Sequence, residues 1–304
     1  WCCCSGGLQG KCSAERDGRA GRGVASSTMA KAEEGEEKSG RPLSWWTPLY
    51  LVDYLTIVVV IVLAVVVALA MEPSDAFADE LHRLPKETQK TYYNYKIQAE
   101  TLPLPAFIPI VLLVPLAVML VSQVWVTSLH DLHNGVMGLI FAFALNAVVT
   151  DLLKKFFGQL RPDYLDRVRE DDGEDAGRQS LPSGHASTAS CMAVFLALYL
   201  HGKLRPYRAK DGDGFVLYFL MSFAWLLFAL YAGATRVTDF RHHLLDVFIG
   251  WLLGLLMAVA VYCLVYYPPL HPLDGSPKLR RGSIRQFCWR TTRAGDAVEE
   301  DEEE

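Results

Sequence analysis

Acidic, basic and histidine side chains crowd the segment Thr235–Asp246, which lies between two long apolar runs. Charge at the edge of a membrane span is costly, so such a cluster is a candidate functional site. His242 and Asp246 are four residues apart, and on a helix they would share one face, where the carboxylate would accept the Nδ1 proton of the ring. A histidine held in this way keeps Nε2 unprotonated, as a nucleophile or general base requires. A structural ion pair at a helix end is the competing interpretation.

Two neighbours of this pair are also candidates. Arg236 lies just upstream, where its guanidinium would hold an anion in front of His242. His243 is the rival nucleophile, since it is three residues from Asp246 and would also reach that carboxylate.

A second cluster lies at the end of the apolar run Gly135–Phe157 and just beyond it. Lys154 and Arg161 are seven residues apart, nearly two helical turns, so both would project from one face, near the point where Pro162 stops a helix. Two cations on one face repel each other unless an anion lies between them. Snorkelling of both side chains toward lipid headgroups is the alternative for this pair taken alone.

A third cluster, Ser180-Leu-Pro-Ser-Gly-His185, opens another apolar run. Gly184 permits close approach to the backbone, and the helix that follows offers unpaired N–H groups to an anion. Ser183 adds a hydroxyl donor, and His185 is placed to protonate a departing oxygen. Pro-Ser-Gly alone is more often a turn and helix cap. Together, however, the three clusters suit binding a phosphate dianion, attacking it and protonating the group that leaves.

Positioning these clusters requires membrane-spanning helices. The chain is 51% hydrophobic, and its apolar residues fall in six runs that approach the roughly 20 residues needed to cross a bilayer. The sequence therefore predicts an all-α polytopic membrane protein with six transmembrane helices. The fourth and fifth runs carry small or polar residues and should face other helices rather than lipid. We expect the spans near Leu49–Met71, Ala106–Leu129, Gly135–Phe157, His185–Leu200, Phe215–Tyr231 and Leu244–Tyr266.

The charges of the connecting segments predict the topology. Basic residues gather between Lys203 and Lys210, and positive residues in short loops mark the cytoplasmic side. We therefore expect cytoplasmic amino and carboxyl termini, with loops 72–104, 158–184 and 232–243, and the active site, at the opposite, non-cytoplasmic face. Loop 72–104 is expected to lie on the membrane surface. The plasma membrane and endomembranes (ER, Golgi or vacuole) are all compatible with this pattern.

Composition divides the chain into three regions. Residues 1–43 are polar and are expected to be disordered, with residues 1–28 upstream of a true start at Met29. Residues 44–270 form the expected six-helix domain. Residues 271–304 are expected to be a disordered cytoplasmic tail that is basic and then acidic.

In order and internal spacing, the three clusters resemble the signature of the type 2 phosphatidic acid phosphatase superfamily. Flanking residues resemble its lipid phosphate phosphatase branch in particular. The matching residues are, part by part, Lys154 with Arg161-Pro162, then Pro182-Ser-Gly-His185, then Arg236 with His242 and Asp246. Thr235 stands where the family usually has serine, which keeps a hydroxyl but adds a methyl group.

The resemblance implies hydrolysis of lipid phosphate monoesters or pyrophosphates, such as phosphatidate, lysophosphatidate or diacylglycerol pyrophosphate, without a metal or other cofactor. In the mechanism that the resemblance implies, His242 is the nucleophile that forms a phosphohistidine, Asp246 orients the ring of His242, and His185 is the general acid and base. The family spacing also favours His242 over His243. The phosphate-binding residues that it implies are Lys154, Arg161, Ser183, Gly184 and Arg236.

The expected partners are the lipid substrate and membrane lipids, with no nucleic acid; a homo-oligomer is compatible with the sequence. A non-catalytic member of the same fold that binds lipids or partners is the main alternative. Loss of the nucleophile or of a phosphate-binding cation would mark such a member, and every one of these residues is present. Two other functions fit less well. A vanadate-dependent haloperoxidase is normally soluble, so six expected spans count against it, and a transporter would carry charged residues at mid-membrane. Charges in these runs lie near their edges instead, at Asp53, Asp151 and Lys154.

Overall fold

The computed structural model describes residues 47–170, 173–204, 215–269, 271 and 273–278. The predictions for residues 1–43, for the basic link beyond residue 204 and for most of the 271–304 tail lie outside these ranges. Within them the protein is helical, with an antiparallel bridge between Tyr266 and Pro277 as the β-type pairing, so the all-α prediction is confirmed.

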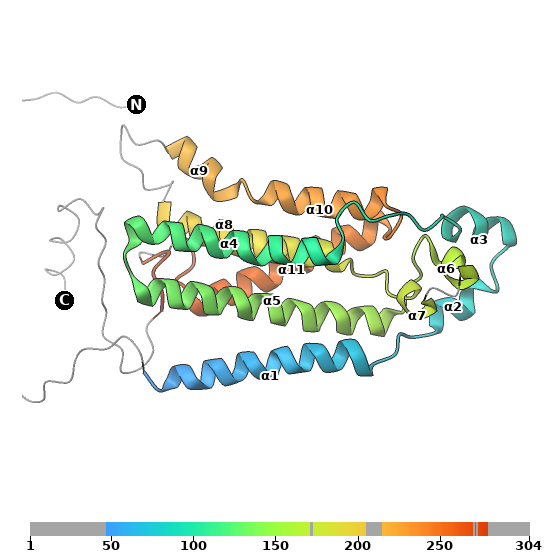
Figure 1. The fold of residues 1–304 in the computed structure, drawn as a ribbon, viewed down its shortest axis with the longest axis horizontal. Coiled ribbons are helices and arrows are strands. Elements are labelled where there is room, and N and C mark those ends of the chain that lie inside the picture. Colours follow the sequence, from blue (N-terminus) through green and yellow to red (C-terminus); the bar gives the residue numbers. More distant parts are fainter. Residues whose placement is uncertain (1–46, 171–172, 205–214, 270, 272, 279–304) are drawn as a thin grey trace, which may run out of the picture. The chain divides into compact units, whose positions relative to one another are not determined.

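Long helices form a bundle, and short ones gather at one end of it (Figure 1). The long helices are α1 (Leu49–Ala70), α4 (Leu104–Val126), α5 (Leu129–Phe157), α8 (Gly184–Leu204) and α11 (Leu244–Val265), together with α9 (Phe215–Phe223) and α10 (Leu226–Thr238) in succession. The short helices are α2 (Ala76–Leu81), α3 (Lys86–Tyr93), α6 (Tyr164–Glu170) and α7 (Glu174–Gly177).

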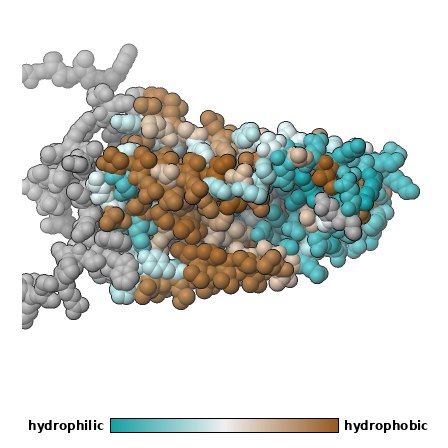
Figure 2. Space-filling view, in the orientation of Figure 1, coloured by the Kyte–Doolittle hydropathy of each residue, from teal (hydrophilic) through white to brown (hydrophobic). Residues whose placement is uncertain are grey.

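The described residues include five segments long and apolar enough to cross a membrane: Leu49–Ala70, Leu104–Val126, Leu129–Phe157, Val216–Thr238 and Leu244–Val265. Their outward side chains are apolar, as on α1, and Figure 2 shows this hydrophobic surface over the long helices. A polytopic membrane protein is therefore confirmed. The α8 helix is not among the five because it opens with small and polar residues, so its place as a sixth span stays a prediction.

The α8 helix lies inside the bundle, where it packs against α11, α10, α5, α9 and α4. Ala186, Ala189 and Ala193 are fully buried on it, which confirms that the fourth run faces other helices. The same prediction is wrong for the fifth run, where Leu217, Leu220 and Leu227 are exposed. The contact of α8 with α11 is close at Gly254, where a Cβ would lie 2.2 Å from the carbonyl oxygen of Ser187. Small residues thus allow the two backbones that carry the second and third clusters to approach each other.

The fifth apolar run extends further than the sequence indicated. A turn at Ala224–Trp225 separates α9 from α10, and α10 then continues to Thr238 rather than ending near Tyr231. Arg236 consequently lies in the last turn of α10.

Loop 72–104 folds against loop 158–184, and its place on the membrane surface stays a prediction. The Ser74 amide donates to the Lys155 carbonyl at 2.9 Å, and the Tyr95 amide donates to the Pro162 carbonyl at 3.2 Å. Gly158 ends α5 with φ 60°, and a Cβ there would lie 2.0 Å from the Ser74 carbonyl oxygen. Side chain packing between the loops involves Leu81, Leu160 and Tyr164. We call residues 71–103 and 158–183 the polar cap; its hydrophilic surface is visible over α2, α3, α6 and α7 in Figure 2.

Candidate active site

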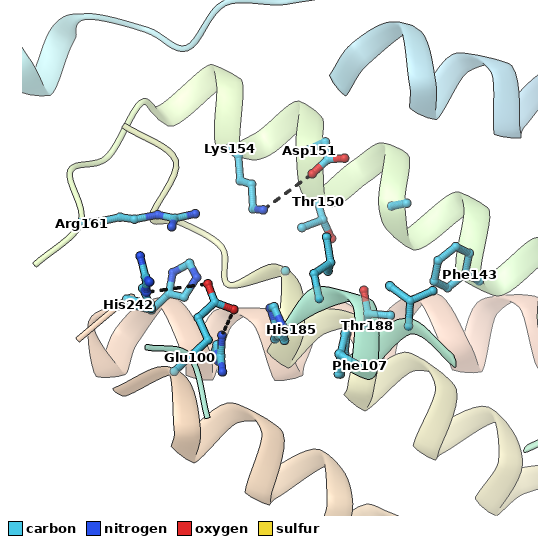
Figure 3. Close-up of a pocket in the computed structure, with 16 residues that line it drawn as sticks. Glu100, Phe107, Phe143, Thr150, Asp151, Lys154, Arg161, His185, Thr188 and His242 are labelled. Carbon is cyan, nitrogen blue, oxygen red and sulfur yellow. Dashed lines mark hydrogen bonds and ion pairs between the residues drawn. The ribbon is translucent and has the colours of Figure 1, made fainter. Parts of the chain in front are cut away.

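A cavity of about 360 Å³ lies where α4, α5, α8 and α10 meet the polar cap. Each of the three clusters contributes to its wall, and Figure 3 shows their side chains around the common space. Its lining residues are Glu100, Leu104, Phe107, Ile108, Phe143, Ala147, Thr150, Asp151, Lys154, Arg161, Gly184, His185, Thr188, Arg236, Arg241 and His242.

Two of the cations reach the cavity from α5 and the polar cap. Lys154 projects from the last turn of α5, with its Nζ 3.7 Å from Asp151 Oδ1. Arg161 has no carboxylate at ion-pair distance among the described residues, and its buried Nε has no hydrogen-bond partner there. Burial, and then the nearby Arg167, lower the pKa of Arg161 to about 10, which leaves the guanidinium protonated at neutral pH. The wall thus holds a charged group without a counter-ion.

The third cation, Arg236, is buried and held from several directions. Its Nη2 donates to Asp239 Oδ2 at 3.0 Å, and its Nη1 lies 3.2 Å from Glu100 Oε2. Its Nε donates to the Thr235 hydroxyl at 3.2 Å. Thr235 therefore supplies the hydroxyl contact that a serine at this position would make, and its methyl group does not displace Arg236 from the cavity wall.

His242 lies in the turn before α11 and not on a helix, so the expected pairing with Asp246 on one helix face is wrong. Its Nδ1 lies 2.7 Å from the Ser180 carbonyl oxygen and 3.9 Å from Asp246 Oδ2. Because a carbonyl only accepts, Nδ1 carries the proton and Nε2 is free as a base. The Asp246 carboxylate is already engaged: its Oδ2 accepts from the Ser180 hydroxyl at 2.5 Å and from the His243 amide at 2.9 Å. Ser180 thus contacts both residues, Asp246 through its hydroxyl and His242 through its carbonyl.

The electrostatic surroundings keep His242 neutral. Burial holds its pKa well below the usual range, and the charges of Arg161 and Lys154 lower it further. A neutral ring with a free Nε2 is the form that attacks an electrophile.

His243 lies elsewhere. Its Nε2 donates to the Leu160 carbonyl at 3.3 Å, and its ring packs edge-on against Tyr93 in the polar cap. It is not on the cavity wall, whereas His242 is.

The second cluster lies at the amino end of α8. Gly184 faces Lys154, and a Cβ there would lie 3.0 Å from the Lys154 Nζ. The Ser183 hydroxyl is buried and has no hydrogen-bond partner in the described part of the chain. His185 packs against Phe107, and its Nε2 donates to the Leu102 carbonyl at 3.1 Å. Gly184 and His185 thus line the cavity with Lys154, whereas Ser183 does not line it.

Three residues that sequence reasoning did not assign also belong to the site. Ser180 connects Asp246 to His242, and Glu100 and Arg241 lie on the cavity wall. Arg241 donates to the Gln98 carbonyl at 2.8 Å. Its position beside His242 was a signal that could have found it, whereas Glu100 is 136 residues from Arg236 and no spacing rule links them. Among the described residues, no group of three or more His, Cys, Asp or Glu side chains is arranged to hold a metal ion.

Comparison with known proteins bears on this arrangement. Residues 135–269, which contain all three clusters, match the model of the PAP2 superfamily. Lipid phosphate phosphatase 2 of Arabidopsis thaliana is 32% identical over 241 residues, which cover 73% of this chain and 79% of that protein. The chain belongs to the PAP2 superfamily.

Other relatives place this PAP2 protein in the lipid phosphate phosphatase branch. Lipid phosphate phosphatase 1 of Arabidopsis thaliana is 30% identical over 70% of this chain and 69% of its own length. Phospholipid phosphatase 2 of Homo sapiens is 32% identical over 48% of this chain and 57% of its own length. No solved structure matches the chain. The PAP2 match begins after Glu100, so the polar cap adds this acidic residue to the pocket from outside the matched region.

Proposed function

We propose that this protein is a lipid phosphate phosphatase that hydrolyses phosphate monoesters or pyrophosphates of lipids through a phosphohistidine, without a divalent metal. The proposal rests chiefly on the convergence of Lys154, Arg161, Arg236, His185 and His242 on one cavity. It is supported by the Nε of Arg161, a buried donor on the cavity wall that has no hydrogen-bond partner among the described residues, because such a group needs an explanation that a bound phosphate supplies.

In the first step His242 Nε2 attacks phosphorus. The new N–P bond forms as the P–O bond to the lipid breaks, and His185 in its protonated form gives a proton to the departing oxygen. The Ser180 carbonyl keeps the Nδ1 proton in place and, with Asp246 3.9 Å away, stabilises the positive ring. The fixed cations stabilise the charge on the transferring group, and so take the part that a metal takes elsewhere.

In the second step water attacks the phosphohistidine. His185, now neutral, takes a proton from the water, the N–P bond breaks, and inorganic phosphate leaves with His242 neutral again. His185 Nε2 donates to Leu102 in the free protein, so His185 must exchange this contact, or use Nδ1, to reach the leaving oxygen.

The shape of the cavity supports a lipid substrate. Beyond the charged end its wall is apolar, with Leu104, Phe107 and Ile108 from α4 and Phe143 and Ala147 from α5. Both helices are candidate membrane spans, so this half suits the chain of an amphipathic molecule whose phosphate lies at headgroup depth. The names of the relatives, lipid phosphate phosphatase and phospholipid phosphatase, support the same substrate class.

The topology belongs to the same proposal. We infer six spans with α8 as the fourth, both termini in the cytoplasm, and the cavity at the non-cytoplasmic face. The two loops of the polar cap and the α10–α11 turn meet at one end of the bundle, as this topology requires.

Trapping of the covalent intermediate tests this mechanism. Protein purified in detergent is mixed with lysophosphatidate carrying ³²P in its phosphate, quenched in alkali and digested. We expect alkali-stable, acid-labile label on a peptide that contains His242, and none in His242→Ala. Rapid phosphate release with no trapped label in the wild type, or label on His243, would contradict the assignment.

A further inference from the structure

The segment Gln98–Leu102, between α3 and α4, contacts groups that the proposed mechanism uses. The Leu102 carbonyl accepts from Arg236 Nη2 at 3.2 Å and from His185 Nε2 at 3.1 Å. Glu100 Oε2 lies 3.2 Å from Arg236 Nη1. In Figure 3 the Glu100 carboxylate lies between His242 and His185, among the cationic side chains. In the free protein this segment therefore occupies hydrogen-bond donors that a phosphate ester needs.

The backbone of this segment is held independently of the Glu100 side chain. Thr101 donates from its amide and its hydroxyl to the two oxygens of Asp239, at 2.9 and 2.6 Å. Arg241 holds the Gln98 carbonyl at 2.8 Å. The Glu100 side chain is 29% exposed, so rotation of its own bonds can carry the carboxylate toward solvent while the segment stays in place.

Arg236 faces two carboxylates that differ in how firmly they are held. Asp239 receives the two hydrogen bonds from Thr101 and is buried, so it is fixed. Among the described residues, Glu100 is held by the two arginines alone, with its Oε1 3.7 Å from Arg241 Nε. A phosphate on Arg236 Nη1 and a carboxylate on the same group would repel each other in a partly desolvated cavity. Glu100 is therefore the anion that leaves when phosphate binds.

We propose that Glu100 is an intramolecular competitor for the phosphate site: its carboxylate takes a phosphate-oxygen position on Arg236, and a phosphate-bearing ligand binds by displacing it. The inference rests on the proposed function. Displacement lowers the affinity of every phosphate by the same factor. A lipid phosphate regains affinity from the apolar half of the cavity, while inorganic phosphate has no such contact. Glu100 thereby lowers occupancy of the site by inorganic phosphate, the product, while the apolar contacts keep the lipid substrate bound.

The test is the inhibition constant of inorganic phosphate against lysophosphatidate hydrolysis, in wild type, Glu100→Gln and Glu100→Ala. If the paired state holds about nine-tenths of the free enzyme, the constant falls about tenfold when the carboxylate charge is removed. Glu80→Gln is the matched control, because Glu80 lies on α2 in the same polar cap and pairs with the exposed Arg83. An inhibition constant that is unchanged or higher in Glu100→Gln overturns the inference, since a residue that merely positions Arg236 gives that result.

A second measurement needs no turnover. The rise in the midpoint of thermal unfolding with inorganic phosphate reports binding to the folded protein. We expect Glu100→Gln to show this rise at about tenfold lower phosphate concentration than wild type. Phosphate binding strengthened by Glu100→Gln without hydrolysis of any lipid would sink the proposed function and leave the competitor role standing. Hydrolysis with unaltered phosphate binding would sink the competitor role alone.

Discussion

Two buried polar clusters lie at opposite ends of α5, near Asp131 and near Lys154. At a rise of 1.5 Å per residue, these two positions are about 35 Å apart along the helix. At one end Asp131 pairs with Lys203, and their side chains are 2% and 1% exposed. Tyr199 donates to Asp131 Oδ2 at 2.9 Å, and Lys203 also donates to the Gly275 carbonyl at 2.7 Å. At this end the buried charges are matched.

At the other end the charges are only partly matched. Lys154 and Asp151 are 3.7 Å apart and 14% and 31% exposed, and Arg161 has no carboxylate partner among the described residues. Buried charges are stable only when paired. The paired cluster around Asp131 and Lys203 therefore holds the segment that follows α11 against α5 and α8. In the partly paired cluster, the charges of Lys154 and Arg161 stay available to bind an anionic ligand. At the two ends of α5, completeness of pairing rather than the number of charges therefore distinguishes the Asp131–Lys203 cluster from the proposed site residues Lys154 and Arg161.

His242→Ala should have the largest effect. Its Nε2 is the proposed nucleophile, so we expect phosphate release to fall to background. The midpoint of thermal unfolding should change little, because within the described ranges the ring makes a single hydrogen bond, to Ser180. His243→Ala is the matched control and should keep a measurable fraction of activity. If a phosphate-release assay shows the larger loss in His243→Ala, the nucleophile is His243 and the assignment of His242 is contradicted.

The same lysine-to-methionine change at the two ends of α5 tests the comparison itself. Lys154→Met should lower kcat/KM about 10²–10³-fold, because it removes a charge that stabilises the transition state. It should cost little stability, since Asp151 stays hydrated.

Lys203→Met should do the opposite. It strands the buried Asp131, which costs about 3–5 kcal/mol of stability. Activity per folded molecule should persist. Thermal unfolding in detergent, measured beside phosphate release, separates the two outcomes, and equal loss of stability in both variants would erase the distinction between the ends.

A smaller effect is expected for Gly184→Ala. The added methyl group lies 3.0 Å from Lys154 Nζ and displaces it by a few tenths of an ångström. Small misplacements of catalytic groups are costly, and we expect kcat/KM to fall about tenfold. Steady-state kinetics on lysophosphatidate measure this fall. Equal activity of wild type and Gly184→Ala would show that Lys154 tolerates the shift.

The smallest predicted change is a shift of the pH profile. In the proposed mechanism the neutral form of His242 reacts, and the lowered pKa of His242 keeps the ring neutral as the pH falls below 6.5. Arg161→Gln removes one charge that lowers this pKa, so the pKa rises and the acid limb of kcat/KM moves to higher pH. Ionisation of the substrate phosphate affects the profiles of variant and wild type equally, so it does not contribute to the difference between them. Arg83→Gln, on the exposed surface, should leave the profile unchanged, and an acid limb that stays fixed in Arg161→Gln would mean that another group controls it.

The sequence predicted those parts of the site that depend on residue type and local spacing. Lys154, Arg161, His185, Arg236 and His242 reach one cavity, as the three clusters indicated. Their roles in the chemistry stay predictions that the variants above test.

The parts that the sequence did not predict depend on the backbone or on distant contacts. The partner of His242 Nδ1 is the Ser180 carbonyl, and a carbonyl leaves no mark in residue type. The four-residue spacing of His242 and Asp246 also predicted a shared helix face, but the Asp246 side chain accepts the His243 amide and so starts α11 after His242. Glu100 reaches Arg236 only because the polar cap folds over the bundle end, which no local pattern indicates.

The most direct test of the central claim is phosphate release from lipid phosphates by detergent-purified wild-type protein in the presence of a metal chelator, with a short-chain water-soluble phosphate ester in parallel. The account predicts release from phosphatidate, lysophosphatidate or diacylglycerol pyrophosphate that is unaffected by the chelator and much slower release from the soluble ester. Activity that disappears with the chelator, or that acts on the soluble ester alone, would contradict it.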